Sequence, residues 1–307
     1  MKRWNRRWVE WAAVLGCVGF GLAILFPAAG LARGGGKAEV CMANLHLMTR
    51  SWLAYAEDND SQIVGSATYE WDGWQTRRYP AWAPTTTIKV KNFVGIPQNE
   101  AHGNSYVALA DEIRGIKQGG LWPYLGTEWV YHCPSDTRYL KQAGGGIGRW
   151  GGYRSYSIGC PLNGYAYGDG WATGEYYATV YKSNEITSPD SKIVFVEETD
   201  GSGFNENTWD LFLVGATFPN FWPGDPLSCL HNQRSTLGFA DGHSEQHPWQ
   251  DKAVIKTFGD QIKNGSNPPG NPAYLFGPDE GGDLCWFVRH YVPRTPQSGT
   301  NFYPLPK

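Results

Sequence analysis

The stretch of this sequence with the most side chains suited to metal binding or catalysis is Asp241-Gly242-His243-Ser244-Glu245-Gln246-His247. Its ionisable residues stand at every second position, and alternate residues of an extended strand point to the same face of a sheet. Imidazole nitrogens and carboxylate oxygens gathered on one face are ligands for zinc or another divalent ion. With one further histidine from upstream, the spacing predicts a candidate metal site made of His231, Asp241, His243, Glu245 and His247.

Two interpretations of this segment are open. In the first, Glu197 or Glu198 joins from a neighbouring strand, and the set supports metal-dependent hydrolysis centred on His231, Asp241 and His243. In the second, these are polar residues on the solvated face of a hairpin that turns at Asp241-Gly242. We favour the structural interpretation, because spacing alone shows no partners that would orient metal ligands.

Other catalytic and cofactor-binding patterns give no support for an enzyme. The sequence has no Gly-x-Ser-x-Gly elbow and no Walker loop, and no Ser/His/Asp or Cys/His set stands out. The run Gly146-x-Gly148-x-x-Gly151 has the spacing of a dinucleotide loop, but no strand is expected before it and no helix after it. The sequence therefore predicts a protein that is not an enzyme.

The composition narrows the class of protein further. The chain has 307 residues, enough to bury a sizeable core, and a formal net charge of −3. Nucleic-acid binding needs a basic excess that this chain lacks, so we expect no nucleic-acid partner. The 15 Trp residues suggest an alternative function, because exposed aromatic rings stack on sugars and anchor protein interfaces. That alternative is a membrane-anchored glycan- or protein-binding module.

The N-terminal segment predicts the position of the chain relative to a membrane. Residues 11–32 carry no charge, and as a helix they would span roughly 33 Å, enough for a bilayer core. Four basic residues precede them, which predicts a cytoplasmic N-terminus over residues 1–10, a transmembrane helix over 11–32 and the remainder outside. A cleaved signal peptide that ends at Gly30-Leu31-Ala32 is the alternative.

A second helix is expected beyond the membrane anchor. Apolar residues recur there at spacings of four and three, which is one helical face; they are Cys41, Leu45, Met48, Trp52 and Tyr55. This pattern predicts a stem helix over residues 33–60. Residues 61–307 alternate strand-like and turn-like stretches and predict an α+β globular domain. Its clearest expected elements are strands over 87–90, 192–196 and 236–240 and a helix over 108–116.

Several of these residues together resemble one bacterial family. Glu10 and Pro27 lie in a positively flanked apolar helix with the spacing found in type IV pilins and type II secretion pseudopilins. Cys41, Asn44 and Leu45 match the Cys-x-x-Asn-Leu stem of a pseudopilin-like family. The same family has a segment similar to the one that begins here at Cys133 and continues Pro-Ser-Asp.

The third point of resemblance is His231, which is followed by nine residues and then Asp241-Gly242. This pattern is similar to the prepilin-type processing-associated H-X9-DG domain. The resemblance runs from Glu10 to about Trp249 and implies a pilin-like fold, with a long N-terminal helix packed on an antiparallel sheet that carries large loop insertions. It implies a structural role in a type II secretion or type IV pilus-type assembly, at the bacterial inner membrane, with other pilin or pseudopilin subunits as partners.

The resemblance has further implications for cross-links, ions and processing. It suggests a disulfide between Cys41 and Cys133, and we add Cys160 with Cys229 as a second candidate pair. Related pseudopilins hold calcium through loop carboxylates, for which the stretch 57–60 offers oxygen ligands, although such a run is more often a solvated helix end. The family's peptidase cuts after a Gly that precedes the helix, and residues 5–10 contain none, so cleavage is left open.

Overall fold

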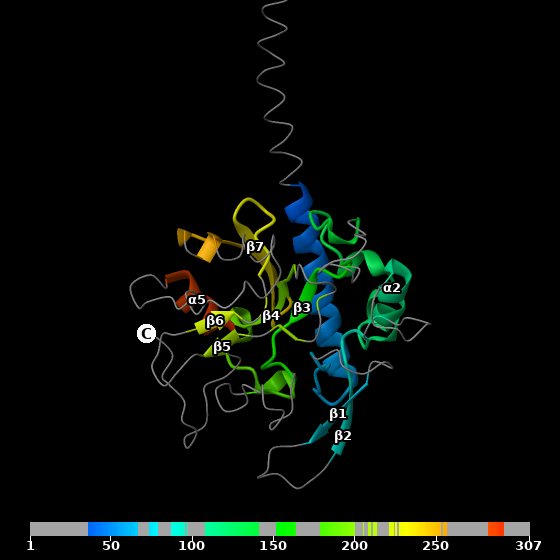
Figure 1. Ribbon diagram of the computed structural model, residues 1–307. Coiled ribbons are helices and arrows are strands. Elements are labelled where there is room, and N and C mark those ends of the chain that lie inside the picture. Colours follow the sequence, from blue (N-terminus) through cyan, green and yellow to red (C-terminus); the bar gives the residue numbers. More distant parts are fainter. Residues whose placement is uncertain are drawn as a thin grey trace, which may run out of the picture.

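In the computed structural model, a long helix runs along a four-stranded antiparallel sheet, with short helices and hairpins around both (Figure 1). The structure describes residues 36–66, 74–78, 87–95, 97, 108–140, 152–163, 179–199, 205, 208–209, 211–213, 221–223, 225, 227–252, 254–256 and 282–291. The long helix covers residues 36–58 and is called the stem helix here. After it come β1 (Trp74–Arg78), β2 (Thr87–Lys91), α2 (Leu109–Gln118), α3 (Trp122–Leu125), η1 (Glu128–Tyr131), η2 (Arg138–Leu140), β3 (Tyr156–Ile158), η4 (Ser183–Glu185), η5 (Pro189–Ser191), β4 (Ile193–Glu197), β5 (Leu211–Leu213), β6 (Phe221–Pro223), β7 (Arg234–Phe239), β8 (Ser244–Pro248) and α5 (Gly282–Tyr291).

The stem helix buries the face that its periodicity predicts. Four of its apolar residues are fully buried, namely Cys41, Leu45, Met48 and Trp52. The helix ends where Asp60 and Ser61 adopt left-handed φ angles of 52° and 66°, a conformation that regular helices do not continue. The Ser61 N–H donates to the Ala56 carbonyl at 2.8 Å and satisfies one of the last free carbonyls of the helix.

The sheet has the strand order β3-β4-β7-β8 and is covered on both faces. All five residues of β4 are buried, as expected of a central strand with packing on each side. Val194 and Phe195 belong to the core that contains the stem helix, whereas Ile193 and Val196 pack with Phe287 of α5. Figure 1 shows α5 and the stem helix on opposite sides of the sheet. The α+β expectation is therefore confirmed.

The hairpin between β7 and β8 turns where the sequence predicts, at Asp241-Gly242. Gly242 has a φ of +99°, a conformation open to glycine and costly for other residues. The turn is fastened to the stem helix by two hydrogen bonds. The Thr49 hydroxyl donates to the Gly242 carbonyl at 3.0 Å, and the Ser244 hydroxyl donates to the Met42 carbonyl at 2.8 Å.

Gly238 allows the sheet to approach the stem helix closely. A Cβ at this position would lie 2.7 Å from Cγ2 of Thr49, so a side chain there forces the helix and the sheet apart. Gly238→Ala is expected to lower the free energy of unfolding by roughly 1–3 kcal/mol. Gly36→Ala is the control, since no atom lies within 4 Å and alanine favours the helix. Urea unfolding midpoints check this, and equal effects of the two changes would contradict it.

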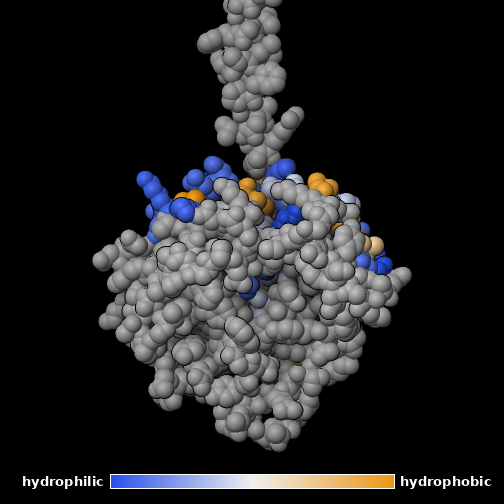
Figure 2. Space-filling view, viewed as in Figure 1, coloured by the Kyte–Doolittle hydropathy of each residue, from blue (hydrophilic) through white to orange (hydrophobic). Residues whose placement is uncertain are grey.

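The predicted membrane anchor lies outside the described residues, together with Glu10 and Pro27. Within the described ranges, no helix combines the length and the apolar character needed to cross a membrane. Figure 2 shows mostly hydrophilic side chains around the N-terminal end of the stem helix, with a few apolar ones among them. The large apolar side chains exposed in the described part of the chain are Val40, Leu47, Trp129 and Leu140.

Candidate functional site

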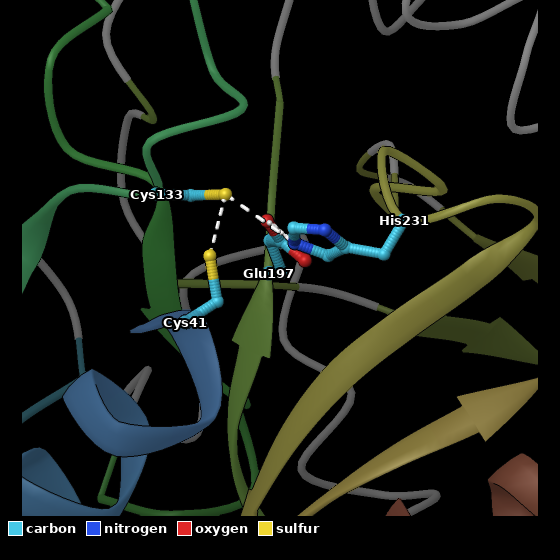
Figure 3. Close-up of side chains that lie close together, drawn as sticks. All are labelled: Cys41, Cys133, Glu197 and His231. Carbon is cyan, nitrogen blue, oxygen red and sulfur yellow. Dashed lines mark hydrogen bonds and ion pairs between the residues drawn. The ribbon is translucent and has the colours of Figure 1, made fainter. Parts of the chain in front are cut away.

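Four side chains of the types that ligate metal ions meet beside the buried face of the stem helix (Figure 3). They are Cys41 on the stem helix, Cys133 in the loop after η1, Glu197 at the end of β4 and His231 in the turn before β7. One ligand atom of each lies within 4.8 Å of the others, and all four residues are buried. This group could hold a metal ion. The described ranges contain no second group of three or more such residues that is as close.

The four side chains contact one another in series, from Cys41 through Cys133 and His231 to Glu197. The Sγ atoms of Cys41 and Cys133 are 2.7 Å apart, and both cysteines are free. The Cys133 Sγ lies 3.4 Å from Nε2 of His231, which in turn lies 3.2 Å from Oε1 of Glu197. The disulfide between Cys41 and Cys133 stays a prediction, although the structure brings the two sulfurs together.

Burial and the contacts within the group shift the pKa values of Cys133 and His231. Burial, followed by the contacts with Cys41 and Glu197, raises the pKa of the Cys133 thiol well above its usual range. Burial alone would lower the pKa of His231. Its contacts with Cys133 and Glu197 outweigh burial and raise this pKa to about 10. The Cys133 thiol therefore stays protonated, and the His231 imidazole is positively charged beside the Glu197 side chain.

The side chains of Glu197 and Cys133 also accept hydrogen bonds from residues outside the group. The other carboxylate oxygen of Glu197, Oε2, accepts a hydrogen bond from the Thr236 hydroxyl at 2.8 Å. The backbone N–H of Ser135 donates to the Cys133 Sγ at 3.4 Å. The surrounding strands and loop therefore orient the carboxylate and one sulfur before any ion binds.

Asn44 lies one helical turn after Cys41 and ties the stem helix to the segment that carries Cys133. Its Nδ2 donates to the His132 carbonyl at 3.0 Å. Asn44→Ala is expected to lower the free energy of unfolding by about 1 kcal/mol, because this partly buried carbonyl loses its donor. The neighbouring exposed change His46→Ala should have almost no effect. Thermal unfolding of both variants checks this, and an Asn44→Ala variant as stable as His46→Ala would refute it.

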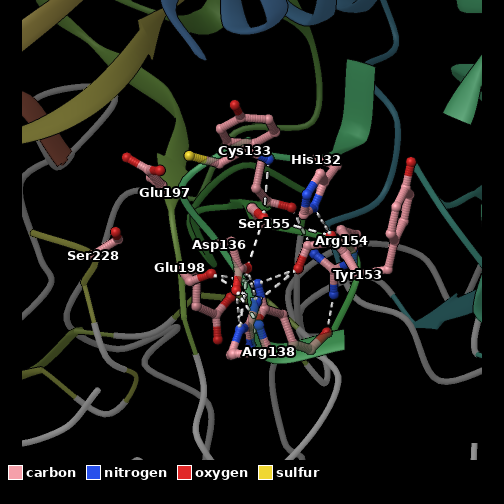
Figure 4. Close-up of polar contacts among 12 residues, drawn as sticks. His132, Cys133, Asp136, Arg138, Tyr153, Arg154, Ser155, Glu197, Glu198 and Ser228 are labelled. Carbon is pink, nitrogen blue, oxygen red and sulfur yellow. Dashed lines mark hydrogen bonds and ion pairs between the residues drawn. The ribbon is translucent and has the colours of Figure 1, made fainter. Parts of the chain in front are cut away.

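A buried ionic network positions the segment from Cys133 to Asp136 (Figure 4). The Cys133 N–H donates to the Ser155 hydroxyl at 3.1 Å, and that hydroxyl donates to Oδ2 of Asp136 at 2.7 Å. Arg138 places Nη2 2.7 Å from the same carboxylate oxygen. Asp136 is almost fully buried, so its charge needs these partners. The network fixes the loop that presents the Cys133 thiol.

The structure does not bring His231 to the hairpin residues with which the sequence grouped it. The six residues of β7 separate His231 from Asp241, a strand length of about 20 Å. Asp241 and His243 do pair, with Oδ1 2.5 Å from Nδ1, at an exposed turn. Glu245 stands opposite Leu237 in the register. The five-residue metal site and the hydrolytic centre on His231, Asp241 and His243 are therefore not assembled.

The remaining sequence-predicted residues lie in separate places. His247 stacks on Trp286 of α5 with ring centroids 3.7 Å apart. The pairing of Cys160 with Cys229 stays a prediction. In the stretch 57–60, Asp58 accepts a hydrogen bond from the Tyr124 hydroxyl at 2.8 Å. Calcium binding by that stretch also stays a prediction.

Comparison of the chain with protein-family models, with curated proteins and with solved structures gives no significant match. A functional conclusion therefore has to come from the fold, the buried Cys/Glu/His group and the sequence patterns themselves.

Proposed function

We propose that this chain is a pseudopilin-like structural protein of a type II secretion or type IV pilus-type assembly. Residues 11–32 anchor it in the bacterial inner membrane, and the globular domain lies in the periplasm or outside the cell. Its partners are the membrane and other pilin or pseudopilin subunits or secretion components. One observation carries the proposal. The stem helix that follows the apolar segment packs along an antiparallel sheet, which is a pilin-like arrangement.

The residues of the resembled motif support a structural role by where they lie. Asn44 donates to the His132 carbonyl, and the Gly242 carbonyl accepts a hydrogen bond from Thr49 of the stem helix. Cys41 meets Cys133 in the core. Each of these contacts links the stem helix to the globular domain. A force that acts on one of them is therefore transmitted to the other.

The buried Cys/Glu/His group also fits a structural role better than a catalytic one. A catalytic metal site keeps one position open for water or substrate. Here all four side chains are buried, and His231, the most accessible of them, is 6 % exposed. A divalent ion in this group would therefore support the fold rather than a reaction.

The test is the mature N-terminus of the protein, measured by mass spectrometry on material taken from a native bacterial envelope. A start near Arg6 with an N-methylated amine would support the proposal, because it is the product of prepilin processing. A start at Met1 or Lys2 would contradict a role as an assembled subunit. A start at Arg33 would contradict the membrane anchor itself.

A further inference from the structure

We propose that Cys41, Cys133, Glu197 and His231 bind one divalent ion of the zinc class, which fastens the stem helix to the globular domain. Thiolate and imidazole ligands favour zinc over calcium or magnesium, which prefer oxygen ligands. The four ligands come from four separate elements of the chain. Their convergence is produced by the tertiary fold, and it does not depend on whether the protein joins a pilus-type assembly.

Two of the distances within the group fit edges of a tetrahedral zinc site. With bonds of about 2.3 Å to sulfur and about 2.0–2.1 Å to nitrogen or oxygen, S···N and N···O edges are about 3.5 and about 3.3 Å. The corresponding distances here are 3.4 Å from Cys133 Sγ to His231 Nε2 and 3.2 Å from that nitrogen to Glu197 Oε1.

The distance between the two sulfur atoms is shorter than in a zinc site, so one cysteine side chain must move. Two sulfurs on one zinc ion lie about 3.8 Å apart. Those of Cys41 and Cys133 are 2.7 Å apart, so the ion has to separate them by about 1 Å. Rotation of the Cys41 side chain on the stem helix can supply this movement. The remaining ligand–ligand distances are all within 4.8 Å.

The surroundings of the ligands suit charged thiolates. The Ser135 N–H points at the Cys133 Sγ, and a hydrogen bond to a thiolate is stronger than one to a neutral thiol. Tyr156 is fully buried, and its hydroxyl has no hydrogen-bond partner in the described part of the chain. A phenol hydroxyl is a hydrogen-bond donor, so it can donate to a metal-bound sulfur.

The net charge of the occupied site is small. Two thiolates, one carboxylate and a neutral imidazole carry three negative charges, which an ion with two positive charges reduces to one. Buried charge of this size is tolerated when hydrogen bonds surround it, as the Thr236 and Ser135 donors do here. Any protons on the two sulfurs and on the coordinating imidazole nitrogen leave to solvent when the ion binds.

A disulfide is the competing outcome, and it explains less of the arrangement. It would use only Cys41 and Cys133, and it requires neither a buried carboxylate nor a histidine beside it. Glu197 is fully buried and contacts His231 at 3.2 Å, and a disulfide gives this pair no role. An ion, in contrast, is bound by all four side chains.

The experiment measures metal content and thiol state on the full-length chain, purified in detergent without chelator after alkylation of accessible thiols at lysis. Elemental analysis should find about one zinc per chain. Mass spectrometry after unfolding should find Cys41 and Cys133 reduced. A disulfide between these two cysteines, or a metal-free chain that stays metal-free after incubation with zinc sulfate, would overturn the proposal.

Variants separate ligation from general effects on folding. Glu197→Gln and His231→Gln should each weaken zinc binding at least tenfold, as measured by competition with a chromogenic chelator. Cys285→Ser on α5 is the matched control and should keep its zinc. Because a variant can fail to fold, the unmodified chain is also stripped with chelator. Its Tm should fall and recover when zinc is added back, and an unchanged Tm would contradict a structural ion.

Discussion

Replacement of Trp52 by alanine is expected to lower the free energy of unfolding by about 3–5 kcal/mol, the range for large side chains removed from a well-packed core. Trp52 lies on the stem helix, is fully buried and belongs to the core between that helix and the sheet. Its loss leaves a cavity at the contact that carries the proposed function. Urea unfolding of the purified chain measures the effect.

A second substitution at the same position tests the physical reason. The indole N–H of Trp52 is buried and has no hydrogen-bond partner in the described part of the chain. Trp52→Phe removes this unpaired donor together with some volume, and the two effects offset, so we expect a loss under about 1.5 kcal/mol. Leu47→Ala on the exposed side of the stem helix should cost less than about 1 kcal/mol. A Trp52→Ala variant no less stable than Leu47→Ala would show that the stem helix does not carry the core.

The parts of the fold that the sequence predicted are those with a local signal. The face of the stem helix follows from helical spacing, and the turn at Asp241-Gly242 follows from the conformational freedom of glycine. The expected strands over 192–196 and 236–240 correspond to β4 and β7 with small shifts at the ends. Helix α5 was not predicted. Its buried apolar residues Phe287, Val288 and Tyr291 do recur at helical spacing, but over a helix of only 10 residues the signal is short.

The candidate site was predicted only in pieces. The family resemblance suggested a disulfide between Cys41 and Cys133. The residue pattern grouped His231 with the hairpin, with Glu197 or Glu198 as a possible neighbour. The structure joins all four, although Cys41 and Cys133 are 92 positions apart and Cys133 and His231 are 98 apart. No spacing rule covers such separations. The alternation from Asp241 to His247 gave a strong local pattern, but it reflects a hairpin strand with half-exposed polar residues.

Glu112→Ala is expected to be the most damaging change outside the stem helix, with a loss of about 3–5 kcal/mol. Glu112 belongs to α2 and is almost fully buried. Its carboxylate accepts the backbone N–H groups of Tyr153 and Arg154 at 2.8 and 2.7 Å. Burial raises the pKa of this carboxyl more than those hydrogen bonds and the nearby Arg138 and Arg154 lower it. The contribution of Glu112 to stability therefore depends on its acceptor oxygens as well as on its charge.

The matched variant is Glu112→Gln, which keeps the volume and one acceptor oxygen. Alanine leaves two buried N–H donors unpaired and opens a cavity, whereas glutamine loses the charge and one acceptor, so it should cost about half as much. Glu57→Ala, an exposed change on the stem helix, should stay within about 0.5 kcal/mol of the unmodified chain. Because residues 153–155 support Asp136 and hence the Cys133 loop, Glu112→Ala should also expose the Cys133 thiol to alkylation. Equal stability of the alanine and glutamine variants would show that the two hydrogen bonds contribute little.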